Sequence, residues 1–207
     1  MGERDATELF SEWALRDRDL GMERGHAASV GEMLSLAMSR IGGEFSAVDV
    51  GCGNGWVCRA LEGNEDCSMA VGVDGSEEMI RKARSRGDGE FHHVRLPGWE
   101  PPRKYDLVHS MEFLYYLRDP ISMLSEIHDN WVEPGGVLVA GVDHYKENEK
   151  SLDWPLALSV HMTTLSEGEW KRGMTEAGFE NVETHRVGLK DGFAGTLAMI
   201  GTKSASL

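Results

Sequence analysis

Apolar positions along the chain follow two periods, one typical of helices and one typical of strands, and these periods alternate. Between residues 30 and 41, apolar side chains fall at i, i+3, i+4, i+7, i+8 and i+11, which predicts an amphipathic helix. Gly42 and Gly43 end this pattern, and the β-branched run at 45–51 predicts the first strand. The charged segment 5–20 also carries apolar positions, so we expect a helix there as well.

The rest of the chain continues the alternation. Strands are predicted at 71–74, 90–95, 105–110, 137–139, 179–187 and 194–202, and helices begin after Ser76, Asp119 and Ser166, which are good N-cap residues. The segment 96–104 holds three prolines and is too short for a helix. Helices alternating with strands predict an α/β fold, with a Rossmann-like, doubly wound, mostly parallel sheet in three α/β/α layers.

The most informative motif follows the first strand. Gly51, Gly53 and Gly55 stand at alternate positions, and a helical pattern starts at Trp56. A strand, a tight glycine turn and a helix let a ligand approach bare backbone, because no Cβ atom stands in the way. About 20 residues after the turn, an apolar run ending at Asp74 predicts a second strand whose carboxylate reaches ribose hydroxyls. The first third of the chain therefore predicts a nucleoside-containing ligand.

The glycine spacing separates two kinds of nucleoside ligand. The dinucleotide fingerprint is G-x-G-x-x-G, and its third glycine allows a helix to pack closely on a strand. In this chain Trp56 holds that third position, and the glycine stands one place earlier, at Gly55. Because a bulky indole hinders that packing, a dinucleotide site is the disfavoured interpretation.

The pattern Asp-x-Gly-x-Gly-x-Gly at 49–55 resembles motif I of the class I S-adenosylmethionine-dependent methyltransferases. Two later segments resemble the same family in the right order: Tyr105–Ser110 is similar to its strand four, and Glu133–Val139 to its turn into strand five. The resemblance covers about residues 26–201. It implies that the C-terminal strand is antiparallel and forms a hairpin with the strand before it.

In that family the glycine turn passes beneath the methionine and ribose parts of S-adenosylmethionine. The resemblance thus implies that Asp74 holds the ribose hydroxyls, and that Asp49 supports the turn and the cofactor's amino group, with a purely structural carboxylate as the alternative. Arg95 stands where relatives often carry an Asp for adenine, so adenine recognition falls to the backbone at 94–96 or to stacking on Met79. The implied cofactor-binding residues are Asp49, Gly51, Cys52, Gly53, Asn54, Gly55, Asp74, Gly75, Met79, Arg95, Leu96, Ser110 and Met111.

Side chains after the fourth and fifth strands are the catalytic candidates, because ligands bind beyond the carboxyl ends of strands in open α/β sheets. Glu112 is a candidate base or hydrogen-bond acceptor, and Tyr115 a candidate wall of the methyl site. Asp143 and His144 begin a long connection on the ligand side, and imidazole titrates near neutrality, so His144 is a candidate general base. The alternatives are a solvated loop, ordinary core aromatics and surface histidines. These residues require no metal.

We expect a single structural domain in two parts: helices at 1–44 that cap the cofactor site, with a helix junction at Gly21–His26, and the S-adenosylmethionine-binding methyltransferase domain at 45–207. The net charge of −14 argues against direct binding of nucleic acid by the chain's own surface, because phosphate contacts need a surface rich in Lys and Arg. Three cysteines without metal-ligand spacing, a charged N-terminus and no bilayer-length apolar run predict a cytoplasmic protein without a membrane partner.

Together these expectations predict an S-adenosylmethionine-dependent methyltransferase. The acceptor stays open between a small molecule and RNA or protein of the translation apparatus. The segments 110–116 and 141–148 resemble a small archaeal and bacterial subgroup of undefined substrate, some members of which work with a small zinc-containing activator protein. The alternatives are a catalytically silent S-adenosylmethionine-binding scaffold and, less favoured, a nicotinamide-dependent oxidoreductase.

Overall fold

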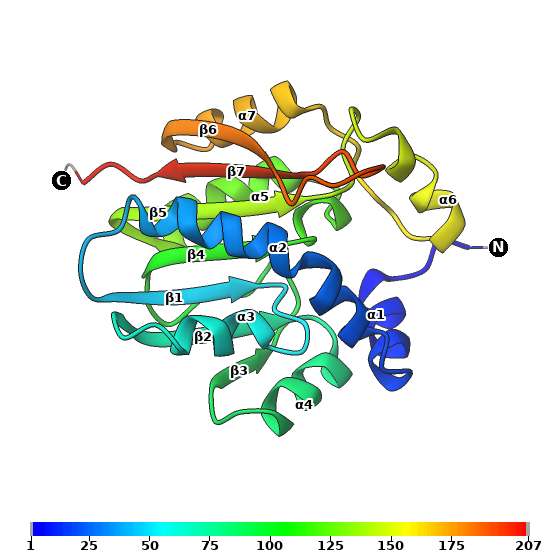
Figure 1. Ribbon diagram of the computed structural model, residues 1–207, viewed down its shortest axis with the longest axis horizontal. Helices are drawn as coiled ribbons and strands as arrows, with labels where there is room; N and C mark the ends of the chain where they lie inside the picture. Colours follow the sequence, from blue (N-terminus) through cyan, green and yellow to red (C-terminus); the bar gives the residue numbers. More distant parts are fainter. Residues whose placement is uncertain (1, 206–207) are drawn as a thin grey trace.

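The computed structural model describes residues 2–205 and shows a seven-stranded sheet between two layers of helices (Figure 1). The strands are β1 (Phe45–Val50), β2 (Cys67–Asp74), β3 (Glu90–His93), β4 (Tyr105–Met111), β5 (Val132–Val142), β6 (Glu180–Val187) and β7 (Thr196–Thr202). Their order in the sheet is β3-β2-β1-β4-β5-β7-β6. Strands β1 to β5 pair in parallel, whereas β7 is antiparallel to both β5 and β6. The predicted fold class is confirmed.

The helices occupy the connections that the sequence pattern assigns to them. They are α1 (Ala6–Leu15), α2 (Asp19–Met38), α3 (Trp56–Glu62), α4 (Glu77–Ser85), α5 (Pro120–Glu126), α6 (Trp154–Leu158) and α7 (Glu167–Glu176). Short 3-10 turns, η1 (Leu114–Tyr116) and η3 (Glu149–Ser151), follow β4 and β5, and a π-helical turn, η2 (Ile127–Trp131), extends α5. No helix within residues 2–205 has the length and apolar character that crossing a bilayer requires.

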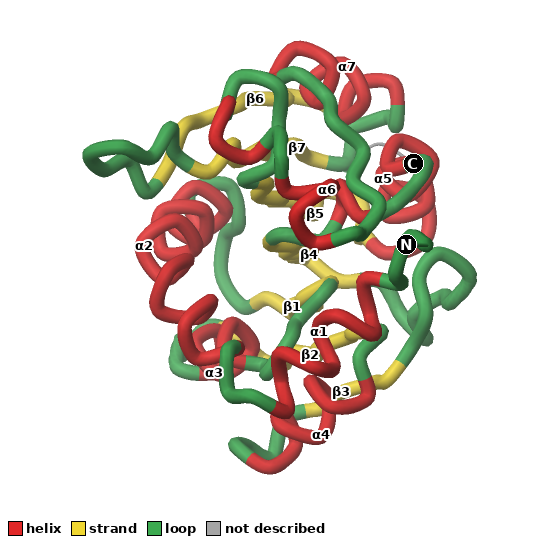
Figure 2. The backbone as a smooth tube through the Cα atoms, turned by 90° about the vertical axis from the view of Figure 1, so that its right-hand side faces the viewer, coloured by secondary structure: helices red, strands yellow, loops and turns green. Residues whose placement is uncertain are grey.

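The sheet separates two apolar layers. On one face α2, α3 and α4 cover side chains such as Ala47 and Leu107, and on the other face α5 and α7 cover Val48 and Val108. Consecutive residues fall in different layers because successive side chains of a strand point to opposite faces. Figure 2 shows α2 and α3 on one side of the strands and α5 and α7 on the other.

Side chains fix the starts of three helices. Ser76 Oγ accepts the N–H of Met79 at 3.2 Å, and Asp119 Oδ1 accepts the N–H of Ser122 at 2.9 Å. Ser166 and Glu169 form a reciprocal capping box at the start of α7. The predicted caps are confirmed, and they place the loops that precede α4 and α5 at the carboxyl edge of the sheet.

The predicted helix junction at Gly21–His26 is wrong, because α2 begins at Asp19 and runs through both glycines of this segment. A glycine inside a helix costs about 1 kcal/mol relative to alanine, and tertiary contacts outweigh that preference here. The buried side chains of α2 pack on the sheet, and Asp19 is held by ion pairs at its first turn. The longer helix carries His26 to the carboxyl edge of the sheet, where α1, α6 and the N-terminal segment also lie (Figures 1 and 2).

Candidate functional site

The turn between β1 and α3 forms the floor of the candidate site. Gly51, Gly53 and Gly55 have φ angles of 77°, 53° and 77°, a region that other residues rarely adopt. A Cβ atom at Gly51 would stand 2.8 Å from the Cβ of Phe113, and one at Gly55 would stand 2.6 Å from the ring of Phe91. The glycines therefore allow the tight turn, and they also allow Phe113 and Phe91 to pack directly against its backbone.

A cavity of about 440 Å³ lies between this turn, the ends of β2, β3 and β4, and the N-terminal helices, at the end of the sheet that faces the viewer in Figure 2. This volume lies within the range of small-molecule sites. Among the residues that the sequence analysis assigns to cofactor or acceptor, the cavity is lined by Asp49, Gly51, Cys52, Gly53, Asn54, Asp74, Gly75, Met79, Arg95, Leu96, Met111 and Glu112. The lining does not include Gly55, Ser110, Tyr115, Asp143 or His144.

Asp74 ends β2 with its carboxylate against the glycine turn. Its Oδ2 accepts the N–H of Gly53 at 2.9 Å, and its Oδ1 accepts the N–H of Ser76 at 2.7 Å. Burial raises the pKa of Asp74, and the two amide hydrogen bonds oppose that rise. Because each carboxylate oxygen has two lone pairs, both oxygens can also accept a hydrogen bond from a ligand hydroxyl.

Asn54 ties the glycine turn to α2 through contacts that sequence reasoning missed. Its Nδ2 donates to Asp19 Oδ2 at 2.9 Å and to Glu23 Oε2 at 3.1 Å. Asp19 is only 3% exposed and also pairs with Lys82 at 2.6 Å and with Arg86 at 3.1 Å. Burial alone would raise the pKa of Asp19, but the hydrogen bonds from Lys82 and Asn54 and the two cations lower it. The network thus locks α2, the turn and α4 together.

At the β3 side of the cavity the lining is mostly apolar. Met79 is buried at 2% exposure, and Leu96 lines the cavity from the loop after β3. The guanidinium of Arg95 turns to Asp5 in the N-terminal segment and forms an ion pair with it. Arg95 therefore already has an acidic partner within the chain. Met79 and Leu96 supply the apolar surface on this side of the cavity.

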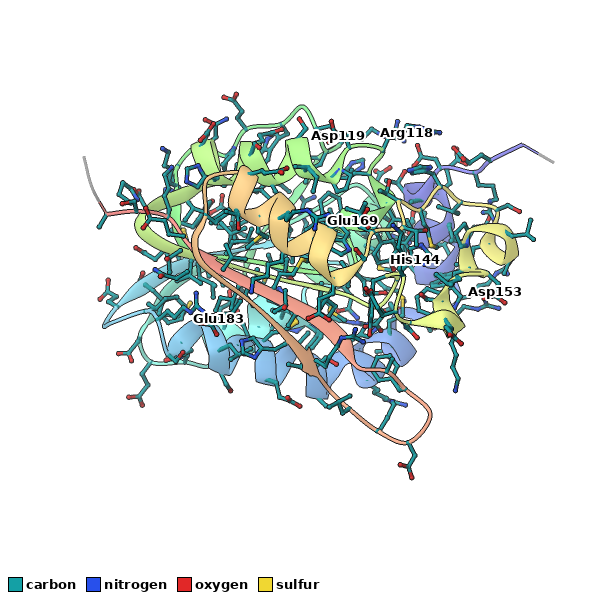
Figure 3. All side chains as sticks on the ribbon, turned by 90° about the horizontal axis from the view of Figure 1, so that it is seen from above. Arg118, Asp119, His144, Asp153, Glu169 and Glu183 are labelled. Carbon is teal, nitrogen blue, oxygen red and sulfur yellow. The ribbon has the colours of Figure 1, made fainter. Side chains whose placement is uncertain are left out.

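Residues 3–5, which we call the N-terminal strap, cross the mouth of the cavity. The N–H of Arg4 donates to the carbonyl of Ser159 at 2.7 Å, just after α6. Two ion pairs hold the strap on either side of that contact: Glu3 pairs with Arg118 and Asp5 pairs with Arg95. Figure 3 shows Arg118 near the start of α5, close to the N-terminal segment. Sequence periodicity carried no signal for this strap, because its contacts come from residues distant in the chain.

Glu112 follows β4 in a left-handed conformation, with φ of 58°. Its Oε2 accepts the hydroxyl of Tyr115 at 2.6 Å, and its Oε1 accepts the N–H of Asp143. The hydroxyl of Tyr116, which lines the cavity, lies 3.2 Å from that of Tyr115. Burial, reinforced by the negative charge of Asp143, raises the pKa of Glu112 to about 8. A carboxyl that titrates near neutrality at a cavity wall is suited to accept or release a proton.

His26 and Asp143 stand beside Glu112. The Nε2 of His26 lies 3.6 Å from Asp143 Oδ2, and Asp143 Oδ1 accepts the hydroxyl of Thr196 at 2.6 Å. Burial alone would lower the pKa of His26, but Asp143 and Glu112 raise it above its ordinary value. One ligand atom from each of the three residues lies within 4.8 Å of the others, a spacing that suits a metal ion. Both oxygens of Glu112 already accept hydrogen bonds, so these contacts need no ion, and the absence of a metal stays a prediction.

Three candidates lie behind the cavity wall rather than in it. Ser110 donates its hydroxyl to the carbonyl of Val50 at 2.9 Å, and Tyr115 is 1% exposed. His144 is fully buried, and its nitrogens are engaged by the carbonyl of Ser151 at 2.9 Å and the hydroxyl of Thr164 at 2.7 Å.

These contacts change the interpretation of His144. Burial lowers its pKa, and a neutral ring that donates from Nδ1 to the carbonyl satisfies both contacts. Because neither nitrogen faces the cavity, we do not retain His144 as a candidate base. Its neighbour Asp143 does reach the cluster with His26, since adjacent side chains at a strand end point to opposite faces.

Asp49 and His109 form a buried pair on neighbouring strands. Asp49 Oδ1 lies 2.7 Å from His109 Nδ1, and the two residues are direct partners in the register of β1 and β4. Asp49 is 2% exposed and still lines the cavity, whereas His109 is fully buried. Sequence analysis singled out Asp49 but not His109, which occupies an ordinary strand position.

Aromatic rings form part of the cavity lining. Phe10 of α1 meets Tyr116 edge-to-face with ring centroids 5.3 Å apart, and Phe113 packs against the turn at Gly51. All three rings line the cavity. The floor and inner wall thus combine the carboxyl groups of Asp49 and Asp74 with aromatic faces, an arrangement that attracts a cationic group carrying hydroxyls.

Comparison with known proteins places the chain among methyltransferases. A protein-family model described as a methyltransferase domain matches residues 8–184. The chain is similar to trans-aconitate 2-methyltransferase of Agrobacterium fabrum, with 28% identity over 135 residues that cover 65% of this chain and 50% of that protein. It is also similar to tRNA U34 carboxymethyltransferase of Vibrio atlanticus, with 33% identity over 150 residues, 66% of this chain and 45% of that protein. The chain thus spans about half the length of the curated relatives it matches.

Among solved structures, the chain is similar to the methyltransferase in a complex with the Trm112 methyltransferase activator of Haloferax volcanii. That match has a TM-score of 0.81 and 29% identity, and it covers 97% of this chain and 99% of the other. A complex of DhpI with S-adenosylhomocysteine shares the fold, with a TM-score of 0.71 and 20% identity over 98% of this chain and 97% of that one.

Proposed function

The chain belongs to the class I S-adenosylmethionine-dependent methyltransferase family, and we propose that it transfers a methyl group from S-adenosylmethionine to an acceptor. The observation that carries this proposal is the space above the glycine turn. A Cβ atom at Gly53 would meet only the sulfur of Met79, at 4.0 Å, and would project into the cavity. Gly53 therefore keeps bare backbone available to a ligand beside the carboxylate of Asp74.

We assign the cofactor to the cavity floor. The backbone of the glycine turn would lie beneath the methionine and ribose parts, and Asp74 would accept the ribose hydroxyls. Met79 and Leu96 would sandwich the adenine, with the backbone at 94–96 reading its edge, because Arg95 is engaged by Asp5. The helices within 1–44 would cap this site, since Phe10, Glu23 and His26 line the cavity from above.

We assign the acceptor side to Glu112 and the groups that hold it. S-adenosylmethionine would supply a methyl group on a sulfonium: the acceptor's lone pair would form a bond to the methyl carbon while the carbon–sulfur bond breaks in line, with S-adenosylhomocysteine as the leaving group. Glu112 would take the proton that a hydroxyl or amine acceptor loses, and its pKa of about 8 suits that role near neutral pH. The Tyr115 hydroxyl and the Asp143 N–H position its two oxygens, and Tyr116 and Phe10 enclose the methyl site.

Calorimetric titration with S-adenosylmethionine, S-adenosylhomocysteine and NADH tests the proposal. We expect Kd values of roughly micromolar order for the two adenosyl ligands, no binding of NADH, and no effect of a chelator on binding.

The variant Gly53→Val should bind S-adenosylmethionine roughly 100-fold more weakly or worse, because its side chain occupies the ligand's space. Gly43→Val is the matched control, since Gly43 also has a left-handed φ, of 79°, a Cβ there meets nothing within 4 Å, and Gly43 lies outside the cavity lining. Normal binding by Gly53→Val would contradict the assignment.

Two alternatives predict different results, the first in an assay of methyl transfer and the second in the same titration. A catalytically silent scaffold binds S-adenosylmethionine without turnover, so methyl transfer to any acceptor excludes it. A nicotinamide oxidoreductase binds NADH; Trp56, half-buried in the cavity lining at the position of the third dinucleotide glycine, disfavours it.

The proposal extends to the identity of the methyl acceptor and to a protein partner. The similarity to proteins named for trans-aconitate and for tRNA U34 supports testing a small carboxylic acid and tRNA as acceptors. The similarity to a methyltransferase in complex with an activator supports a small zinc-containing activator as a partner. Transfer of tritium from labelled S-adenosylmethionine, with and without a co-expressed activator, tests both. We also propose a cytoplasmic location, which fractionation of the host cell tests.

A further inference from the structure

The buried pair of Asp49 and His109 has no role in the proposal so far. Both side chains lie on the face of the sheet that α2 and α3 cover, as do Ala47 and Leu107 two residues before them on the same strands. His109 is fully buried there. Within residues 2–205, its Nε2 is one of three buried side-chain atoms without a hydrogen-bond partner.

The unpartnered Nε2 fixes the charge of the pair. A protonated imidazole would carry an N–H at Nε2 inside an apolar layer, and a buried charged donor without an acceptor is strongly unfavourable. The neutral tautomer with its proton on Nδ1 avoids this, because Nδ1 then donates to Asp49 Oδ1 at 2.7 Å. The pair as a whole therefore carries the single negative charge of Asp49.

No neighbour neutralises that charge. In the described part of the chain Asp49 forms no ion pair with Lys or Arg, and its hydrogen bond with His109 uses only its Oδ1. The titratable groups that face it are Asp74 on β2, the thiols of Cys52 and Cys58, and His109 itself, with Glu112 and His26 also lining the cavity. Burial raises the pKa of both thiols, and the charge of Asp49 adds to that rise, so they stay neutral.

We propose that His109 is a positioning residue for the cofactor: it holds Asp49 Oδ1 so that Oδ2 faces the cavity as an uncompensated negative charge for the cationic part of S-adenosylmethionine. This inference rests on the proposed function. The geometry supports it in two ways: Asp49 lines the cavity next to the glycine turn, and His109 contacts the carboxylate from the neighbouring strand β4 without lining the cavity itself.

The test compares two substitutions of His109 with different hydrogen-bonding capacity. In His109→Asn the amide nitrogen takes the place of Nδ1 and keeps the donor, whereas His109→Leu removes it. Titrations of S-adenosylmethionine from pH 6 to 8.5 give the ratio of each variant's Kd to that of the wild type at the same pH. This ratio cancels the titration of Glu112, His26 and Asp74, which the variants share with the wild type.

We expect His109→Asn to bind within about threefold of the wild type at every pH. In His109→Leu the buried carboxylate loses its donor and takes up a proton more readily, so the Kd ratio should be roughly 10-fold at pH 8.5 and rise towards 100-fold at pH 6. Equal binding by the two variants, or a ratio for His109→Leu that does not change with pH, would overturn the inference.

Two further results keep the inference testable. If His109→Leu does not fold, nitrogen-15 NMR of the wild-type imidazole decides: a neutral ring protonated on Nδ1 supports the pair as described, and an imidazolium at pH 7 overturns it. If the wild-type protein does not bind S-adenosylmethionine at all, both the proposed function and this inference fail, which is distinct from equal binding by the two variants.

Discussion

Glu112 adopts a strained backbone conformation that places its carboxyl at the cavity wall. A left-handed conformation at a residue other than glycine costs roughly 1–2 kcal/mol, yet this position carries a glutamate with φ of 58°. The surroundings hold it there, because its N–H donates to the carbonyl of Gly141 at 2.9 Å and its carboxyl accepts hydrogen bonds from Tyr115 and Asp143. A glycine would relieve the strain, but it would remove the carboxyl from the cavity wall.

The titration of Glu112 leads to a prediction about stability. Its pKa is about 8 in the folded protein, against an ordinary value of 4.5. Between these pH values the unfolded chain gives up a proton that the folded protein keeps, so Glu112 lowers the free energy of unfolding progressively as pH rises, by up to a few kcal/mol at pH 8. Glu112→Gln should therefore be more stable than the wild type at pH 8.5 and not at pH 4.5, as measured by urea unfolding.

The control for this prediction is Glu65→Gln, which removes a carboxyl from the exposed surface. We expect its stability to differ from the wild type by less than about 0.5 kcal/mol at either pH. A stability difference for Glu112→Gln that is the same at pH 4.5 and 8.5 would show that Glu112 titrates at its ordinary pH.

At the scale of elements, local signals determine the sheet and long-range contacts determine much of the site. The glycine turn, the carboxylate of Asp74 and the helix caps follow from short patterns, so the sequence alone predicts a mostly parallel sheet with a ligand at the carboxyl ends of its strands, whereas the order of the strands comes from the structure. The hydrogen bond from Asn54 to Asp19 joins residues 35 positions apart, and the spacing of apolar residues in the sequence does not predict it. The interpretation of His144 changed for a different reason: of two neighbouring side chains at a strand end only one can point towards His26 and Glu112, and the sequence did not show that this is Asp143.

The N-terminal strap is an element whose contribution can be measured. Its two ion pairs, Glu3 with Arg118 and Asp5 with Arg95, are exposed, and such pairs contribute at most about 1 kcal/mol each. We expect the double variant Arg95→Gln, Arg118→Gln to release S-adenosylhomocysteine roughly three- to tenfold faster, since the strap crosses the mouth of the cavity. Stopped-flow displacement measures this rate, and added salt should speed release from the wild type in the same direction.

Arg81→Gln is the matched control for the strap, because it removes another exposed arginine ion pair, the one with Glu78 on α4, outside the cavity lining. Its release rate should equal that of the wild type. If the double variant and this control release the ligand at the same rate, the strap does not restrain the cofactor.

At the scale of the whole molecule, charge is distributed unevenly. The chain carries a net charge of −14, yet three arginines line the cavity: Arg4, which belongs to the strap, and Arg95 and Arg118, which pair with it. Each of them pairs with an acid of the chain: Glu12, Asp5 and Glu3. The mouth is therefore locally balanced, and the surface as a whole repels a polyanion.

This charge balance predicts how the chain alone behaves towards RNA. We expect no binding of fluorescently labelled tRNA at 150 mM salt and micromolar protein, because neutralising phosphates requires a continuous Lys/Arg surface and the mouth arginines already have acidic partners. Fluorescence anisotropy measures this, with a basic RNA-binding protein as the positive control. If the acceptor is tRNA, binding should appear only when a co-purified partner supplies the cationic surface. Binding by the chain alone that weakens steeply with salt would instead show that Arg4, Arg95 and Arg118 exchange their acidic partners for phosphates.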